Sequence, residues 1–380
     1  MILAALLGLS WTFADQPGPG RDLSLSLLLG TAFGIVLQRS RFCFYCIARD
    51  FIERREAAGL YAVLAALGVG TLGYLAVFGA FLPLPSPGRL PPGAHIGPVS
   101  LALVLGAFVF GVGMALSGSC ISAHLYRLGE GATASPFALL GAGLGFVLGF
   151  LSWNPLYLAW IQDAPVVWLP HQLGYGGTAL LQTGLLAALA VWLSRRARPA
   201  DPPQPAATLW EAVARRRWPA AVAGTLVGFI GVLAYLRLAP LGVTAELGSL
   251  ARTAADHAGW LPARLHGLDG FAGCATLVKD ALWSNNGVFV LGLVGGAWAA
   301  ALNAGAFKPG RPRRVGAHFL GGILMGWGGM TALGCTVGTL LSGIMAGALA
   351  GWVFALACLG GIAAMLYLRR AFSPAASPAD

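Results

Sequence analysis

Charged residues are scarce in this sequence. They make up 10% of its 380 residues, whereas 57% are hydrophobic and the mean hydropathy is +0.74. Disorder of the whole chain is excluded, because disordered chains are rich in charge and poor in apolar residues. Six cysteines are too few for a disulfide scaffold. The composition indicates an integral membrane protein, whose net charge of +10 reflects basic loops rather than a nucleic-acid partner.

Long apolar runs occur throughout the chain, and acidic residues lie only at their edges, as the cost of a carboxylate in lipid requires. Runs of about 17 to 25 residues are long enough to cross a hydrocarbon core of about 30 Å. We therefore predict an all-α integral membrane protein with about nine transmembrane helices. The runs are 22–38, 57–82, 99–116, 137–153, 176–193, 219–236, 288–307, 317–333 and 346–368.

The positive charges predict the orientation of these runs. If the runs alternate across the membrane, 18 of the 24 Lys and Arg residues fall on the same side. Basic residues mark the cytoplasmic side. The sequence thus predicts a multi-pass protein of the bacterial inner membrane, with its N-terminus outside and its C-terminus in the cytoplasm.

Two halves of the chain carry matching glycine patterns. Gly106, Gly111, Gly113 and Cys120 align without a gap with Gly321, Gly326, Gly328 and Cys335, and Gly30 and Gly34 match Gly224 and Gly228. Five runs separate equivalent positions, so the two units have opposite orientations. This is the inverted-topology repeat of many secondary transporters.

The repeat gives a division of the chain into five parts. They are an N-terminal apolar segment (1–21), repeat one (22–153), the fifth span with a cytoplasmic linker (154–218), repeat two (219–370) and a disordered tail (371–380). The small and apolar residues after Cys120 and Cys335 predict that both segments dip back into the membrane as re-entrant loops. Such backbone is tolerated only where protein or a water-filled cavity covers it.

The cysteines suggest two kinds of chemistry. Cys43 and Cys46 have the C-x-x-C spacing of redox dithiols and of half a zinc site. A second pair is missing and the histidines lack ligand spacing, so we expect no metal and no cofactor. A membrane thiol-disulfide oxidoreductase that uses this pair remains an alternative. Cys358 lies within the last run and is interpreted as a small buried residue.

Cys120 and Cys335 follow small residues at equivalent places of the two repeats. Ser117 and Gly118 precede the first and Gly334 the second, so both turns can present backbone N–H groups to an anion. A thiol beside such donors has a polarizable sulfur, which suits a soft sulfur-containing anion. The alternative is that these small residues only pack a tight loop.

Stretches 38–43, 113–120 with 125–131, and 334–338 with 341–343 and 351–352 resemble the YeeE/YedE family of sulfur-transport membrane proteins. The resemblance implies uptake of a small sulfur-containing anion, most often thiosulfate, along a constricted path of thiols. By motif match these thiols are Cys43, Cys120 and Cys335, with Cys46 as an alternative to Cys43. Other members are tied to selenium metabolism, so a selenium compound is a second candidate substrate. The long connection around Cys274 departs from the family pattern.

Four charged residues lie close to these motifs. Arg127 is a candidate substrate ligand and could pair with Glu130 to fix the re-entrant turn, or the two could be an interfacial arginine and a helix cap. Arg39 and Arg41 could draw an anion to the inner mouth, although a positive flank explains them equally well. The expected partners are the anion, membrane lipid and a cytoplasmic sulfurtransferase that consumes the ion; a nucleic acid is not expected.

Overall fold

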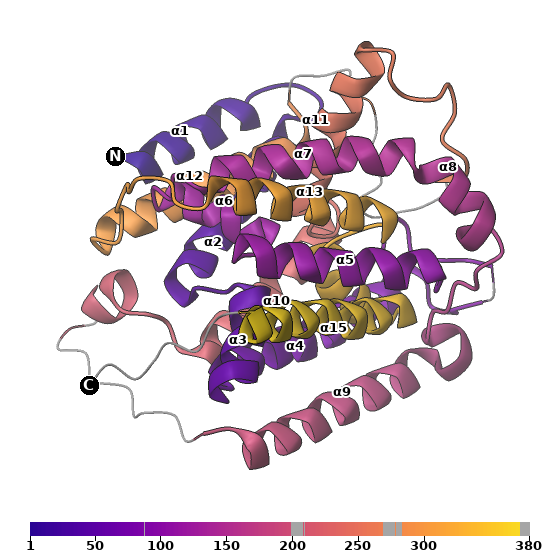
Figure 1. Ribbon diagram of the computed structural model, residues 1–380. Coiled ribbons are helices and arrows are strands. Elements are labelled where there is room, and N and C mark those ends of the chain that lie inside the picture. Colours follow the sequence, from indigo (N-terminus) through magenta and orange to yellow (C-terminus); the bar gives the residue numbers. More distant parts are fainter. Residues whose placement is uncertain (87, 199–207, 209, 269–277, 279–282, 373–380) are drawn as a thin grey trace.

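The computed structural model describes residues 1–86, 88–198, 208, 210–268, 278 and 283–372 (Figure 1). Every predicted apolar run forms a helix. These helices are α2 (Gly20–Ser40), α4 (Ala58–Phe81), α5 (Leu101–Ser117), α7 (Ser135–Leu151), α9 (Pro170–Arg196), α10 (Ala220–Arg237), α12 (Asn285–Asn303), α13 (Val315–Thr331) and α15 (Leu349–Phe372). Named strands are absent from the described residues.

The apolar helices fit the predicted number of spans. Seven helices of the described chain are long and apolar enough to cross a membrane, and nine spans result if each bent helix pair counts as one. The bent pairs turn by 57° at Ser152 and by 43° after Thr331, as expected for broken spans or re-entrant segments. The predicted fold class, an all-α membrane protein with re-entrant features, is confirmed.

Several short helices escaped the sequence prediction, because none has the length of a membrane span. The three that matter for the site are α3 (Phe44–Arg54), α6 (Ile121–Gly129) and the π-helical η4 (Thr336–Ser342). The others are α1 (Ile2–Ala14), α8 (Trp153–Leu156), η1 (Tyr157–Ile161), η2 (Glu211–Arg215), α11 (Val243–His257) and α14 (Gly343–Met345). Each of α3, α6, α11 and η4 follows a long helix after a short break.

The N-terminal helix α1 folds back along α2. The Ser10 and Ser24 hydroxyls hydrogen-bond at 2.8 Å, and Phe13 packs with Leu23, Leu27 and Val288. Figure 1 shows that α1 lies beside α2 at the edge of the bundle. The location of the N-terminus outside the membrane remains a prediction from the charges.

Glycines let α5 and α13 cross in close contact. Gly106 faces Gly328 and Gly113 faces Gly321, and a Cβ at any of the four would come within 2.5 to 2.9 Å of the opposite carbonyl oxygen. The predicted alignment matches Gly106 with Gly321 and Gly113 with Gly328. If each residue is replaced by its counterpart in the other repeat, the Gly106–Gly328 contact therefore becomes the Gly113–Gly321 contact.

The remaining close helix pairs follow the same exchange. Helix α2 packs on α12 and α10 on α4, while α5 packs on α15 and α13 on α7. Under the predicted alignment α2 corresponds to α10, α4 to α12, α5 to α13 and α7 to α15, so each pair has its counterpart. This pairing supports the repeat; the opposite membrane orientation of the halves remains a prediction.

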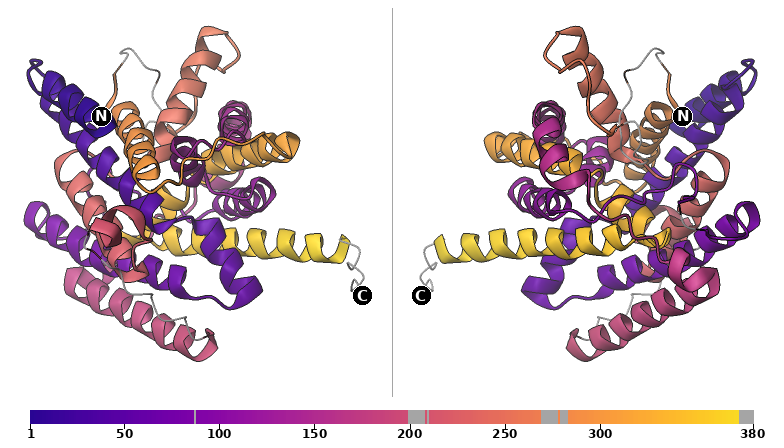
Figure 2. Two further views of the ribbon diagram at one scale, coloured as in Figure 1. Left: turned by 90° about the vertical axis from the view of Figure 1, so that its left-hand side faces the viewer. Right: turned by 90° about the vertical axis from the view of Figure 1, so that its right-hand side faces the viewer.

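Helix α9 lies at the edge of the bundle, where α4 is its main neighbour (Figure 2). Its outward face exposes Leu180, Leu181 and Trp192, as expected for a helix in contact with lipid. Three parts of the sequence discussed above lie outside the described residues: most of the predicted linker (199–205), the tail from residue 373 onward, and Cys274.

Candidate functional site

Three cysteines share one local backbone plan. Cys43, Cys120 and Cys335 are extended residues at the N-cap positions of α3, α6 and η4. Each follows a residue with positive φ that ends the previous helical segment: Arg41, Gly118, and Leu333 with Gly334. The first backbone N–H groups of a helix lack intrahelical partners. Each thiol therefore starts a helix whose free amide groups and dipole favour a nearby anion.

The Ser117–Cys120 turn is locally fixed. The Ser117 hydroxyl donates to the Ser119 carbonyl oxygen at 2.9 Å, and Gly118 has a φ of 79°, which glycine adopts without strain. The Cys335 turn depends on a second glycine, because a Cβ at Gly334 would clash with the Thr339 hydroxyl. The predicted tight turns at both cysteines are thus present in the structure.

Cys43 and Cys120 meet at the centre of this arrangement. Their Sγ atoms lie 4.0 Å apart, and both side chains are fully buried. The backbone N–H groups of Phe44 and Ala123 point at the Cys120 sulfur. These N–H groups begin α3 and α6, so two helix N-termini converge on one pair of thiols.

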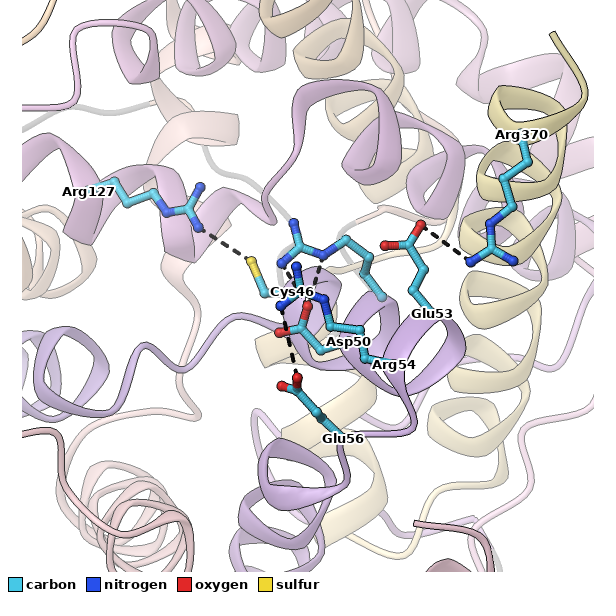
Figure 3. A network of polar contacts seen from close by, with 8 residues as sticks. Cys46, Asp50, Glu53, Arg54, Glu56, Arg127 and Arg370 are labelled. Atoms are coloured by element: carbon cyan, nitrogen blue, oxygen red, sulfur yellow. Dashed lines mark hydrogen bonds and ion pairs between the residues drawn. The ribbon is translucent and has the colours of Figure 1, made fainter. Parts of the chain in front are cut away.

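Cys46 lies one turn further along α3 and contacts Arg127 of α6. The Arg127 Nη2 donates to the Cys46 Sγ at 3.3 Å, and Nη1 donates to the Ser119 hydroxyl (Figure 3). Arg127 is largely buried, so its guanidinium stays where these two contacts hold it. Cys43 and Cys46 interact without a disulfide bond in the structure, and the Cys46 thiol also contacts an arginine on another helix.

A basic cavity of about 490 Å³ opens beside Cys46. Five arginines and two acidic residues line it: Arg41, Arg49, Arg54, Arg127, Arg217, Asp50 and Glu56. Asp50 pairs with Arg49 at 2.7 Å and Glu56 with Arg54 at 3.9 Å, which leaves a clear excess of positive charge. We call this cavity the arginine vestibule. Its field concentrates small anions at the Cys46 end of the site.

The helix that bears Cys46 is held by contacts with Arg127 of α6 and Arg370 of α15 (Figure 3). Glu53 of α3 faces Arg370 of α15 at 3.6 Å, and the Arg49 guanidinium lies over the Tyr45 ring at 5.8 Å. Such exposed ion pairs are individually weak, so they position the short helix rather than stabilise the fold.

Two of the predicted charged residues form hydrogen bonds with other segments of the chain. Arg39 is buried and donates to the Arg216 carbonyl oxygen, while the Arg39 carbonyl accepts from Trp218 N–H at 3.1 Å. Glu130 accepts a hydrogen bond from Gln38 at 3.1 Å and does not pair with Arg127. Of the two alternatives for these residues, the Arg127–Glu130 pair is therefore not the one in the structure, because each has a closer partner.

Cys335 lies apart from the arginine vestibule, beside α15. A void of about 10 Å³ adjoins its turn and is lined by His95, Thr331, Leu333 and Thr339. The His95 Nδ1 and the Thr331 hydroxyl are buried and lack a partner among the described residues. Burial of His95, in the connection between α4 and α5, lowers its pKa to about 4. Its imidazole is therefore neutral near pH 7.

Sequence reasoning missed two features of the site. Ser119 holds Arg127, although only its place next to Cys120 hinted at a role. His124 and His318 meet edge to face with ring centroids 5.8 Å apart, and no spacing in the sequence predicts this pair. Within the described residues, no group of three or more His, Cys, Asp or Glu side chains could hold a metal ion.

The arrangement is suited to an anion with a soft sulfur and hard oxygen atoms. Thiols are polarizable and donate weak hydrogen bonds to sulfur, whereas the guanidinium and backbone N–H groups bind oxygen. Buried thiols in a bundle of spanning helices, next to a basic cavity at one end, define a polytopic membrane transport protein.

A family model described as Sulphur transport matches residues 39–364 of the chain. The chain therefore belongs to this family, and it is a multi-pass transport protein rather than an enzyme. The resemblance to the YeeE/YedE family that the sequence motifs suggested is confirmed.

Three named relatives extend this result. The chain is 30% identical over 341 residues to the "Thiosulfate transporter TsuA" of Spirochaeta thermophila, which covers 86% of this chain and 93% of the relative. The protein of the same name from Escherichia coli is 29% identical over 327 residues, and this alignment covers 82% of this chain and 84% of the relative. The "Probable transporter YedE" of Escherichia coli is 39% identical over 195 residues, 50% of this chain and 45% of its own.

Proposed function

We propose that this protein takes up thiosulfate through a path that passes Cys335, then Cys120 and Cys43, and ends at Cys46 and Arg127. The observation that carries this proposal is the buried Cys43–Cys120 thiol contact behind the arginine vestibule. Two relatives that match most of this chain are named thiosulfate transporters. The finer assignment of substrate and path rests on the chemistry of the residues.

Thiosulfate presents two different ends. Its terminal sulfur is polarizable and meets the S–H groups, while its oxygens meet the backbone N–H groups at the starts of α3 and α6 and then Arg127. No covalent bond forms, so the anion passes from one weak contact to the next. Weak, repeated binding lets an ion enter and also leave.

The path would cross the membrane between two inverted repeats, 22–153 and 219–370, in the bacterial inner membrane. The exchange of glycine contacts between the halves supports this plan. The excess of basic residues supports a cytoplasmic position for the arginine vestibule. Transport is then inward, from Cys335 to the arginine vestibule.

The arginine vestibule also suits a partner that removes the ion. A cytoplasmic sulfurtransferase with an acidic docking surface would meet Arg41, Arg49 and Arg217 at its mouth. By consuming the anion, such an enzyme would maintain the inward gradient. Family membership leaves no role for the dithiol oxidoreductase that the C-x-x-C spacing suggested.

Radiolabelled thiosulfate uptake into proteoliposomes tests the proposal. Cys120→Ala and Cys335→Ala should each lower uptake about a hundredfold, because a buried polar contact in the path is lost. Cys358→Ala is the matched control, since this buried cysteine lies in the middle of α15 and does not begin a helix as the three proposed path cysteines do. Unaltered uptake by Cys120→Ala would refute the path.

The substrate is tested in the same vesicles by competition. Unlabelled thiosulfate should compete strongly and sulfate weakly, because sulfate lacks the soft sulfur. If a selenium-containing analogue competes better than thiosulfate, the selenium alternative replaces the thiosulfate assignment. Equal competition by sulfate would show that the thiols do not select the anion.

A further inference from the structure

A second large cavity lies on the outside of the bundle, between α9 and the starts of α4 and α10. Its volume is about 1,310 Å³, above the 300 to 1,000 Å³ typical of small-molecule sites. Leu64 of α4 and Leu186 of α9 are its largest aliphatic lining residues. Alanines at positions 65, 190 and 221 leave this space open because their side chains are short. We call it the α9 groove.

The position of α9 explains why the groove exists. This helix is 27 residues long, and α4 is its main neighbour in the described bundle. A weak hydrogen bond from the Tyr61 hydroxyl to the Ala190 carbonyl oxygen, at 3.5 Å, spans the two helices. Most residues between the two helices are apolar and both helices are candidate membrane spans, so an acyl chain fills this part of the groove more favourably than water does.

The polar end of the α9 groove carries two arginines. Arg54 and Arg198 line it, and the Arg198 N–H donates to the Arg55 carbonyl oxygen at 3.1 Å, which joins the ends of α3 and α9. Glu56 also lines the groove and lies 3.9 Å from Arg54, but both side chains are more than half exposed. Such a pair is weak, so Arg54 remains able to bind an anion.

We propose that the α9 groove binds one anionic phospholipid of the surrounding membrane. Its phosphate lies between Arg54 and Arg198, and an acyl chain runs between Leu64 and Leu186. Basic pockets between helices at the cytoplasmic side are typical sites for anionic headgroups. The lipid joins α9 to the bundle and, through Arg54, borders the arginine vestibule, which this residue also lines.

Native mass spectrometry of the full-length protein tests the site. The protein is delipidated and then titrated with phosphatidylglycerol or phosphatidylcholine. The wild type should retain phosphatidylglycerol in preference, and Arg54→Gln with Arg198→Gln should lose about five-fold in affinity for each arginine. The matched control is Arg311→Gln with Arg313→Gln, two exposed arginines between α12 and α13 that should have no effect.

A groove-filling variant separates the two parts of the site. Ala190→Phe leaves both arginines in place but occupies the apolar floor, and it should abolish lipid retention while the protein elutes as a single species. Equal retention of the two lipids, or retention unchanged in the double Arg54/Arg198 variant, would overturn the proposal. Thermal stabilisation by inorganic phosphate as large as that by phosphatidylglycerol would also overturn it, since the acyl chain would then contribute nothing.

Discussion

The Sγ atoms of Cys43 and Cys120 lie 4.0 Å apart, although 77 residues separate the two cysteines in the chain. Each thiol begins a short helix that follows a long membrane helix. The two turns thus bring the first backbone N–H groups of α3 and α6 close to the same buried pair of thiols. The arginine vestibule, with Cys46 and Arg127 on its wall, lies next to that point.

Arg127 should not tolerate replacement by lysine. Its guanidinium contacts both Ser119 and Cys46, and a lysine ammonium has no planar fork to reach both. We expect Arg127→Lys to lower thiosulfate uptake about tenfold or more, although the charge is kept. Initial uptake rates in proteoliposomes measure the effect. Arg41→Lys, on the same arginine vestibule but exposed, serves as the control, and equal rates in both variants would contradict the prediction.

Substituting glycines at equivalent helix crossings of the two repeats should destabilise the protein by similar amounts. A Cβ at Gly111 would clash with the Cys358 carbonyl oxygen, and a Cβ at Gly326 with that of Ala142. Overpacking of this kind typically costs about 1–3 kcal/mol. Gly111→Ala and Gly326→Ala should therefore lower the melting temperature in detergent by similar amounts.

The control for these glycines is Gly143→Ala in α7, where no atom lies within 4 Å of the added methyl group. This variant should be neutral or slightly stabilising, because alanine favours helix over glycine by about 1 kcal/mol. Strongly unequal effects at Gly111 and Gly326 would argue against the repeat.

Two reporters, placed on opposite sides of the predicted topology, can determine the orientation of the chain in the membrane. A reporter fused after Arg370 should lie in the cytoplasm, and one inserted near Pro91, between α4 and α5, should lie outside. The physical reason is the retention of basic residues on the cytoplasmic side. Accessibility of the two reporters in intact cells is the measurement. Finding both on the same side would undo the orientation of the arginine vestibule.

Acid should destabilise the protein partly through His95. Burial lowers the pKa of His95 to about 4, whereas an unfolded histidine has a pKa near 6.5. The unfolded chain therefore binds this proton first, so stability is complete above about pH 6.5 and falls as the pH decreases toward about 4. The loss is on the order of 3 kcal/mol over this interval.

His95→Asn tests this pH dependence, because asparagine is polar but does not titrate. Melting temperatures in detergent between pH 7 and 4 should decline less steeply for the variant than for the wild type. The variant will be less stable at pH 7 if its packing is poorer, so the slope and not the absolute value is compared. Parallel slopes would show that His95 is not the group that titrates.

The sequence by itself determined the elements that depend on local composition. All nine apolar runs became helices because a span needs only length and hydrophobicity, and these are properties of a continuous segment. The turns before Cys120 and Cys335 were predicted because glycine and serine set the local backbone. The family motifs were also contained in short segments, and the family match confirmed them.

Only the tertiary structure decided which side chains meet. The C-x-x-C spacing suggested Cys46 as the partner of Cys43, and the two thiols do interact, but Cys43 also contacts Cys120 and Cys46 also contacts Arg127. The Arg39 carbonyl oxygen accepts a hydrogen bond from the Trp218 backbone N–H, and Glu130 accepts one from Gln38, and neither contact could be read from the sequence. These contacts depend on how α2, α3 and α6 pack, because a buried polar side chain pairs with a polar group that the packing brings close to it. The spacing of two residues in the sequence does not give their distance in the folded protein.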